Sequence, residues 1–462
     1  MSSTSNSTTP REVWTSEPGA MAAETAATRW PRIVQDMVDA VAQAMLSSSV
    51  SPAQRGEGED ILRQLKQLKD EIEQDEALLP LTTDGSRETK EYNTKLSSFG
   101  PITWSNSPWL FAECYLYARV NQIITSKPTW REFDVFAQQK ASALAASSNA
   151  VRELSTRYMD LPTSASSPLN DTRVDSDAAY RLFIEMTQVA LWGNATDLSL
   201  LSKLSLDQIH ALQGAKAIEE GQARIVSNDT RAAWEYLCSV DGPRRIDIVL
   251  DNSGFELFTD LVYCLYLLDS GLASDITLHP KSIPWFVSDV LPKDVDVLLS
   301  TLLESPDFQD EDGQTQKLAQ KLKECLARGL IKIKEHRFWT TGFDFQDMPA
   351  EAPDLFEELC KSTLVIFKGD LNYRKLVQDK TWPHSTPFRS ALRCLCGGQS
   401  GSADGVNRKG PKILALRTNK ADVCVGVPEK TVQRLESEAP GQAWVRNGKY
   451  AVISFSDGGP VE

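Results

Sequence analysis

Two neighbouring polar residues, Asp251 and Asn252, have side chains and a setting suited to metal and phosphate chemistry. They come directly after the short apolar run Ile246–Leu250, and apolar residues at helical spacing resume at Phe255. This order predicts a strand, a tight polar loop and a helix. A carboxylate beside an amide oxygen offers hard ligands for a metal ion. The N-terminus of the helix that follows favours anions.

Other polar groups stand beyond further predicted strands. They are Asp289 after Ile276–His279, Asp370 after Leu364–Phe367, and Arg417 and Lys420 after Ile413–Leu416. Strands that alternate with helices of ten or more residues are typical of parallel βαβ units. The ligand crevice of a parallel sheet lies beyond the carboxyl ends of its strands. We therefore expect these groups to converge around Asp251 and Asn252.

Such a crevice would hold two or three carboxylates, one amide oxygen and at least two cations. Hard oxygen ligands suit Mg²⁺ or Mn²⁺ and leave positions for water and a substrate phosphate. The chain has only four histidines, which argues against a zinc hydrolase site. Arg374 would bind the phosphate through its planar fork, and Lys420 would bind it as a point charge. A metal, a phosphate ester and a polarised water predict phosphoryl transfer to water.

Simpler interpretations of the same residues remain open. Asp251 and Asn252 could form an Asx turn, as most Asp–Asn loop pairs do. Asp289 stands before a predicted helix and could be its N-cap. Asp370 could accept a substrate hydroxyl, take a proton from the attacking water or form an aspartyl phosphate, and Asp251 could take the last role instead. We favour a metal-bound water as the nucleophile.

The rest of the chain supplies the elements that would position these groups. Residues 1–28 are rich in Ser, Thr and Ala without a sustained period, which predicts a disordered extension. Apolar residues at helical spacing predict an all-helical N-terminal subdomain at 29–165. The polar stretch 160–177 separates it from an α/β metal-binding catalytic domain at 178–462. The predicted fold class is α/β, with a parallel Rossmann-like sheet flanked by helices.

Three local patterns complete the expected architecture. Leu330–Lys334 predicts one more strand, and Asn447 with Gly448 predicts a C-terminal hairpin. Glu113 and Arg119 lie in an apolar helix, where an unpaired charge is costly. Each either forms a structural ion pair or faces the crevice.

Composition limits the classes of partner. The chain has 462 residues and a formal net charge of -14, from 49 basic and 63 acidic residues, which argues against nucleic-acid binding. The eight cysteines fall mostly in apolar patterns, which indicates reduced core residues. No apolar run is long enough to span a membrane, and the N-terminus lacks the apolar region of a signal peptide. We expect a cytoplasmic protein whose partner is a small-molecule phosphate ester.

Several motifs together resemble one known family. They are LDNSGFEL, SDV, KGDLNYRKL, RTNK, PWLFAECYLY and LWGNATDLSLL. This combination closely resembles the metal-dependent damage-control phosphatases, in particular the subgroup with an R-T-x-K motif near the C-terminus. That subgroup is also called the acidic-residue-methyltransferase-like family. The resemblance runs from about Trp30 to beyond Lys420.

The resemblance implies a ligand set and a substrate class. The implied metal ligands are Asp251, Asn252 and Asp289. The implied substrate contacts are Asp251, Asn252, Asp370, Leu371, Asn372, Tyr373, Arg374 and Lys420. The working metal would be Mn²⁺ or Ni²⁺, with Mg²⁺ possible. The substrates would be sugar phosphates such as fructose 1-phosphate and fructose 6-phosphate, in a damage-control role in hexose phosphate metabolism.

The family's second name points to an alternative function. It records a proposed S-adenosylmethionine-dependent O-methylation of glutamate side chains in a protein partner. The sequence gives this activity little support, because no G-x-G-x-G loop follows a predicted strand and the DNSG loop has only one glycine, Gly254. A pair of metal-binding carboxylates also has no evident part in methyl transfer.

Overall fold

A seven-stranded sheet lies at the centre of the computed structural model, which describes residues 9–48, 50–161, 176–193, 221–396, 409–438 and 440–459. Its strand order is β1-β7-β6-β5-β2-β3-β4. The strands are β1 (Ile225–Asn228), β2 (Arg245–Val249), β3 (Asp275–His279), β4 (Ile331–Ile333), β5 (Leu364–Lys368), β6 (Ile413–Thr418) and β7 (Ala451–Ser456). Neighbouring strands are parallel except β6 and β7, which are antiparallel. The predicted α/β class is confirmed, and all five predicted strands form.

The first face of the sheet is covered by helices that share one apolar core with alternate strand residues such as Ile246 and Ile248. These helices are α6 (Ala137–Ala146), α7 (Ser148–Met159), α8 (Ser176–Trp192), α11 (Thr230–Ser239), α12 (Phe255–Asp269), α13 (Pro292–Glu304) and α14 (Gln314–Ala327). Both α6 and α7 fall inside the predicted N-terminal subdomain, yet Leu144 and Val151 pack into this core. The helical layer therefore ends near Phe136 rather than at 165. Most of the predicted separator, 162–175, lies outside the described residues.

The opposite face packs against shorter elements. Val249 and Phe367 point to this side, because side chains of a strand alternate between faces. The covering elements are η6 (Arg337–Thr340), η7 (Phe345–Asp347), α15 (Met348–Glu351), α16 (Pro353–Cys360), α17 (Gly369–Leu376), α18 (Phe388–Leu392), η8 (Arg393–Cys396), α19 (Glu429–Glu438) and α20 (Ala443–Arg446). A further short turn, η5 (Pro306–Phe308), follows α13 on the first face.

The predicted C-terminal hairpin is wrong. Residues before Asn447 form the short helix α20, which buries Trp444, instead of a strand. The chain around Gly448 pairs with the end of β6, because Gly448 N–H donates to Asn419 O at 2.9 Å. The last strand, β7, then lies between β1 and β6. Burial of the indole ring in the second core favours the helical turn over the local hairpin signal.

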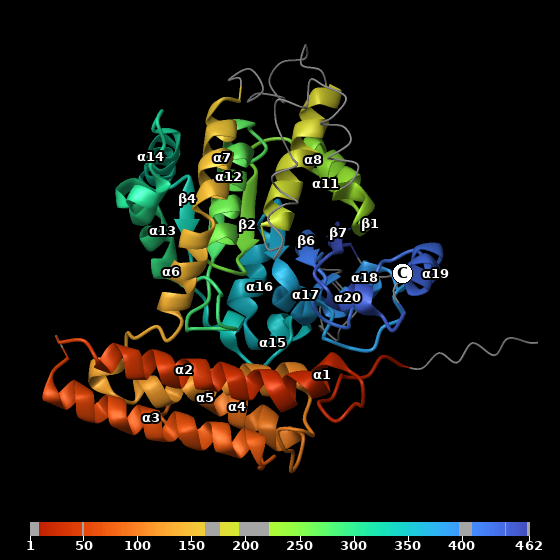
Figure 1. The fold of residues 1–462 in the computed structure, drawn as a ribbon. Helices are drawn as coiled ribbons and strands as arrows, with labels where there is room; N and C mark the ends of the chain where they lie inside the picture. Colours follow the sequence, from red (N-terminus) through yellow and green to blue (C-terminus); the bar gives the residue numbers. More distant parts are fainter. Residues whose placement is uncertain are drawn as a thin grey trace, which may run out of the picture.

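A separate layer of helices lies across one end of the α/β domain (Figure 1). Its elements are α2 (Trp30–Met45), α3 (Pro52–Glu73), α4 (Arg87–Ser98), α5 (Trp109–Thr125) and η2 (Pro128–Trp130). The core of this layer includes Trp285, Leu371 and Ala421, which follow β3, β5 and β6. The helical layer is therefore packed directly on the loops at the carboxyl ends of the strands. In the described part of the chain, no helix is long and apolar enough to cross a membrane.

The predicted disordered extension is folded over its described part, residues 9–28. It contains the short helix α1 (Met21–Glu24) and leads into a π-helical turn, η1 (Thr25–Arg29). The backbone contacts both parts of the molecule, since Trp109 N–H donates to Val13 O at 2.9 Å and Thr381 N–H donates to Arg11 O at 2.8 Å. Long-range pairing of this kind leaves no periodic signal in a sequence rich in Ser, Thr and Ala.

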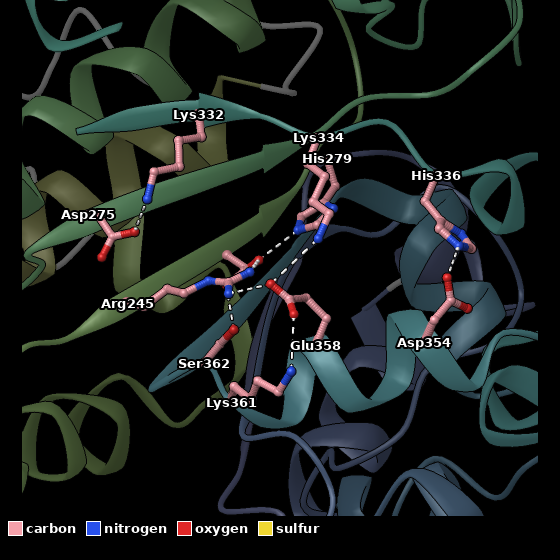
Figure 2. A network of polar contacts seen from close by, with 11 residues as sticks. Arg245, Asp275, His279, Lys332, Lys334, His336, Asp354, Glu358, Lys361 and Ser362 are labelled. Carbon is pink, nitrogen blue, oxygen red and sulfur yellow. Dashed lines mark hydrogen bonds and ion pairs between the residues drawn. The ribbon is translucent and has the colours of Figure 1, made fainter. Parts of the chain in front are cut away.

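A polar network anchors β2 to its neighbours (Figure 2). Asp247, whose side chain is fully buried, accepts hydrogen bonds from Arg245 Nε at 2.9 Å and from Ser362 Oγ, and contacts His279 Nε2 at 2.7 Å. Arg245 also donates to Glu358 at 2.6 Å. Burial raises the pKa of Asp247, but the hydrogen bonds from His279 and Arg245 outweigh burial and hold that pKa below its usual value.

Substitution of Asp247 by Asn should destabilise the fold by about 3 kcal/mol, because Arg245 and His279 lose a buried partner. A carboxylate with a lowered folded-state pKa stabilises the protein above its unfolded-state value of 3.8, and this contribution disappears as pH falls further. Urea unfolding should show the difference at pH 7, and the difference should shrink below about pH 4. Asp354→Asn is the matched control, because Asp354 is an exposed partner of His336. A loss of under about 1 kcal/mol in Asp247→Asn would contradict the network's role.

Candidate functional site

The predicted polar loop after β2 is hydrogen-bonded through its backbone to the loop after β3. Val290 N–H donates to Asp251 O at 2.8 Å, and Ser253 N–H donates to Ser288 O at 2.7 Å. An antiparallel bridge links Asn252 to Asp289. Backbone pairing therefore places the three predicted metal ligands side by side.

The alternative role of Asp289 as a helix N-cap is wrong. Helix α13 begins at Pro292, and its N-cap is Leu291. The carboxylate that caps this helix end belongs to Asp294, which accepts a hydrogen bond from Leu291 N–H at 2.9 Å. Asp289 lies before the cap, and its side chain is buried in the wall of a cleft.

The cleft lies where four neighbouring strands, β3, β2, β5 and β6, end. Its volume is about 410 Å³. The lining residues are Met21, Arg29, Trp109, Glu113, Asp251, Asn252, Phe286, Ser288, Asp289, Asp370, Leu371, Arg374, Lys420, Arg446, Asn447 and Gly448. Strands β3 and β4 are added to the sheet on one side of β2, and β6 is added on the opposite side of β5. The direction of strand order therefore reverses between β2 and β5, which makes their boundary a topological switch point. The cleft opens at the place where parallel sheets bind ligands.

Two of the predicted substrate contacts have side chains that do not reach this cleft. Asn372 is fully buried, and its amide donates to Lys368 O at 2.8 Å and to Leu250 O at 3.1 Å. The Tyr373 hydroxyl accepts a hydrogen bond from Val425 N–H at 3.0 Å. Both side chains hold α17 against its surroundings, because each satisfies backbone groups of neighbouring segments.

Arg374 lines the cleft, but its guanidinium is already engaged. Nε and Nη2 donate to the two carboxylate oxygens of Asp379 at 3.1 and 2.7 Å, and Nη1 donates to Glu113 at 3.2 Å. The guanidinium also stacks 3.8 Å from the centre of the Trp109 ring. Glu113 thus both forms an ion pair and faces the crevice, whereas Arg119 forms its ion pair with Glu71 in the helical layer.

Asp370 lies in the first turn of α17 and is held by the segment after β6. Its Oδ1 accepts hydrogen bonds from Arg417 Nε at 2.7 Å and from Lys420 N–H at 3.1 Å. The Arg417 guanidinium is fully buried and lies 4.4 Å from the centre of the Tyr373 ring. The R-T-x-K segment therefore fixes the orientation of Asp370 and brings Lys420 to the cleft.

A buried acid that the sequence reasoning missed completes this region. Glu256, 2% exposed, accepts a hydrogen bond from Asn252 Nδ2 at 2.7 Å and forms an ion pair with Lys368 Nζ at 3.0 Å. The same Lys368 pairs with Asp260 at 2.9 Å. One sequence pattern could have predicted this role. Glu256 and Asp260 are two acids in an otherwise apolar helix, where each charge requires a partner.

The acids of the site repel one another in a dry environment. Burial, Glu256 and Asp289 raise the pKa of Asp251 well above its usual value. Burial raises the pKa of Asp289 to about 6, although Lys281 lies 3.3 Å from its Oδ2 and lowers it. Such a cluster gains stability from an added positive charge.

The donor set fits a divalent cation. Asp251, Asn252 and Asp289 offer two carboxylates and one amide oxygen, which are the hard ligands that Mn²⁺ and Mg²⁺ accept. Among the described residues, no three Asp, Glu, His or Cys side chains are placed to hold an ion by themselves. Three protein ligands would leave the remaining positions of an octahedral ion for water and a substrate phosphate, as is usual for Mg²⁺ sites.

A glycine makes room for Asp251. Gly369 has φ +82°, and a Cβ built there would lie 1.8 Å from Asp251 Oδ2. Gly369→Ala should therefore displace the carboxylate, weaken Mn²⁺ binding at least about tenfold in calorimetry, and cost about 1–3 kcal/mol in urea unfolding. Gly329→Ala is the control, because Gly329 has φ +70° with open space around it. Equal metal affinity in the two variants would refute the role of this contact.

Comparisons with known proteins point to one family. A family model described as "Damage-control phosphatase ARMT1-like domain" matches residues 25–435. Proteins described as "Damage-control phosphatase ARMT1" are 35% identical in Danio rerio (85% of this chain, 84% of the relative), 33% in Xenopus tropicalis (95% and 97%) and 33% in Homo sapiens (86% and 86%). A solved DUF89 family protein from Pyrococcus horikoshii aligns with a TM-score of 0.41 at 13% identity, over 89% of this chain and 93% of that one.

The family match covers most of the described site. Its range includes the loop after β2, the loop after β3, the start of α17 and the segment after β6. The alignments to the relatives span more than four fifths of the chain at more than 30% identity. This chain therefore belongs to the family of damage-control phosphatases with an ARMT1-like domain, a family of phosphoric ester hydrolases.

Proposed function

We propose that this protein hydrolyses sugar phosphates such as fructose 1-phosphate and fructose 6-phosphate, with Mn²⁺ or Ni²⁺ as the working metal and Mg²⁺ as a possible substitute. Its role would be damage control in hexose phosphate metabolism. The observation that carries this proposal is the convergence of Asp251, Asn252, Asp289, Asp370 and Lys420 on one cleft. A cleft of about 410 Å³ is of a size suited to a small phosphate ester.

The metal would be held by Asp251, Asn252 and Asp289. When bound, such an ion polarises a phosphoryl oxygen and lowers the pKa of a coordinated water. The protein keeps the three ligands in place through backbone bonds between the two loops. Ser288 Oγ also donates to Asn252 Oδ1 at 2.5 Å, and this bond fixes the orientation of the amide.

Lys420 and the first turn of α17 would bind the phosphate. Asp370 and Leu371 lie in this turn, where backbone N–H groups lack helical partners and favour an anion. Lys420 adds a positive charge from the facing segment. The phosphorus atom would then lie between these donors and the acids at the end of β2.

Asp370 has one carboxylate oxygen available for the reaction. Its Oδ1 accepts both bonds from the segment after β6, whereas Oδ2 has no recorded hydrogen bond to the described residues. The side chain is 16% exposed on the cleft. We infer that Oδ2 takes a proton from the attacking water or accepts a sugar hydroxyl, while Arg417 keeps the carboxylate in position.

The methyltransferase alternative has less support from the cleft. The loop after β2 contains one glycine, Gly254. A Cβ built on this glycine would lie 3.7 Å from the backbone nitrogen of Leu144. Gly254 has φ +70°, a backbone conformation that favours glycine, so the turn before α12 accounts for this residue without a cofactor. The clustered acids also have no evident part in methyl transfer.

Phosphate release from a panel of hexose and pentose phosphates tests the proposal. Wild-type protein should release phosphate with Mn²⁺ or Ni²⁺ and should stop when a chelator is added. Asp251→Ala should lose about 10³-fold in kcat/KM, because several kcal/mol of metal stabilisation disappear. Asp296→Ala, which removes an exposed acid of α13, is the matched control and should keep full activity. The proposal would be refuted by phosphate release that is insensitive to the chelator or to Asp251→Ala. It would also be refuted if no sugar phosphate released phosphate.

A further inference from the structure

The cleft contains three arginines, and two of them are already engaged. Arg374 binds Asp379 and Glu113 through its whole guanidinium. Arg446 donates to the Asp422 carboxylate and, at 3.3 Å, to the backbone oxygen of Gly19. Neither can offer its fork to a ligand without breaking an existing ion pair.

The third arginine, Arg29, is different. Its side chain lines the cleft and is exposed, and the structure records no hydrogen bond or ion pair for it with any described residue. It lies at the end of η1, a π-helical turn, and π-helical turns often occur at functional sites. Thr25 and Ala26 of the same turn are buried, so the backbone that carries Arg29 is fixed.

The segment that carries Arg29 is tied to the far side of the cleft. Met21 N–H donates to Asp422 Oδ2 at 3.1 Å, and Asp422 also holds Arg446. Gly19 O accepts the second bond from Arg446. These contacts join the N-terminal segment to the chain after β6, which carries Lys420, and they place Arg29 at the mouth of the same cleft.

The charge balance of the cleft favours this arrangement. Four acids and four cations line the cleft, so the charges of its lining balance. A bound divalent cation would make the lining net positive. Removing Arg29 would take one positive charge from the metal-loaded cleft and would weaken its attraction for a phosphate ester.

We propose that Arg29 is a substrate-binding residue whose guanidinium binds the phosphate group of the substrate. This inference rests on the proposed function, and it gives to Arg29 the role that the sequence pattern assigned to Arg374. A guanidinium binds phosphate through two parallel N–H donors, which adds direction as well as charge. Lys420 and Arg29 would then contact the phosphate from two separate segments of the chain.

Binding of inorganic phosphate to the Mn²⁺-loaded full chain, measured by titration calorimetry, tests this inference directly. Arg29→Gln should raise the Kd for phosphate about ten- to a hundredfold, because a charged hydrogen bond is lost. Arg29→Lys should fall between the wild type and Arg29→Gln, since it keeps the charge but not the fork. Arg32→Gln is the matched control: Arg32 is exposed one turn further along α2, is absent from the cleft lining, and should bind phosphate as the wild type does.

Steady-state kinetics with fructose 1-phosphate provide the second readout. KM should rise about tenfold or more in Arg29→Gln while kcat changes less, and the unfolding temperature should stay at the wild-type value. Unchanged Kd and unchanged KM in Arg29→Gln would overturn the inference and leave the proposed function standing. If the wild type binds phosphate through Arg29 but hydrolyses no sugar phosphate, the assignment of Arg29 as an anion-binding residue survives and the proposed function fails.

Discussion

The site depends on the burial of several carboxylates in one small region. Asp251, Glu256 and Asp289 are each at most 5% exposed, and like charges at short range in a dry environment are costly. Two buried lysines offset part of this cost, since Lys281 pairs with Asp289 and Lys368 pairs with Glu256. The pKa of Asp251 stays raised although Lys281 and Lys420 both lower it. We propose that this excess of buried acid favours a bound cation, and the neighbouring layers keep the acids buried and in position.

The helical layer and the N-terminal segment provide that environment. Trp285, Leu371 and Ala421 come from three different loops at the strand ends, yet all pack into the core of the helical layer. Because this packing holds the loops together, the acids after β2 and β3 and the cation after β6 share one cleft. The N-terminal segment closes another side and brings Arg29, so every layer of the fold contributes to the same site.

Sequence patterns were sufficient to predict those parts of the site that follow from the periodicity of the strands. The apolar runs and their polar ends predicted the sheet and the meeting of Asp251 with Asp289, because parallel strands end at one edge. The partners of a side chain were not predictable in this way. Arg374 carries the residue type of a phosphate ligand but is bound to Asp379, and Glu256 lies in a helix that reads as apolar core. Arg29 directly follows residues 1–28, whose composition predicts disorder, and the long-range backbone contacts that fold this segment leave no sequence pattern.

The central claim is that the acids at the ends of β2 and β3 hold a catalytic metal beside a phosphate-binding surface. A crystal structure of the full chain with Mn²⁺ and inorganic phosphate, with the ion located by its anomalous signal, tests it most directly. We predict one ion ligated by Asp251, Asn252 and Asp289, with the phosphate between this ion and Lys420. An ion bound elsewhere, or a cleft that holds phosphate without any metal near Asp251, would contradict the account.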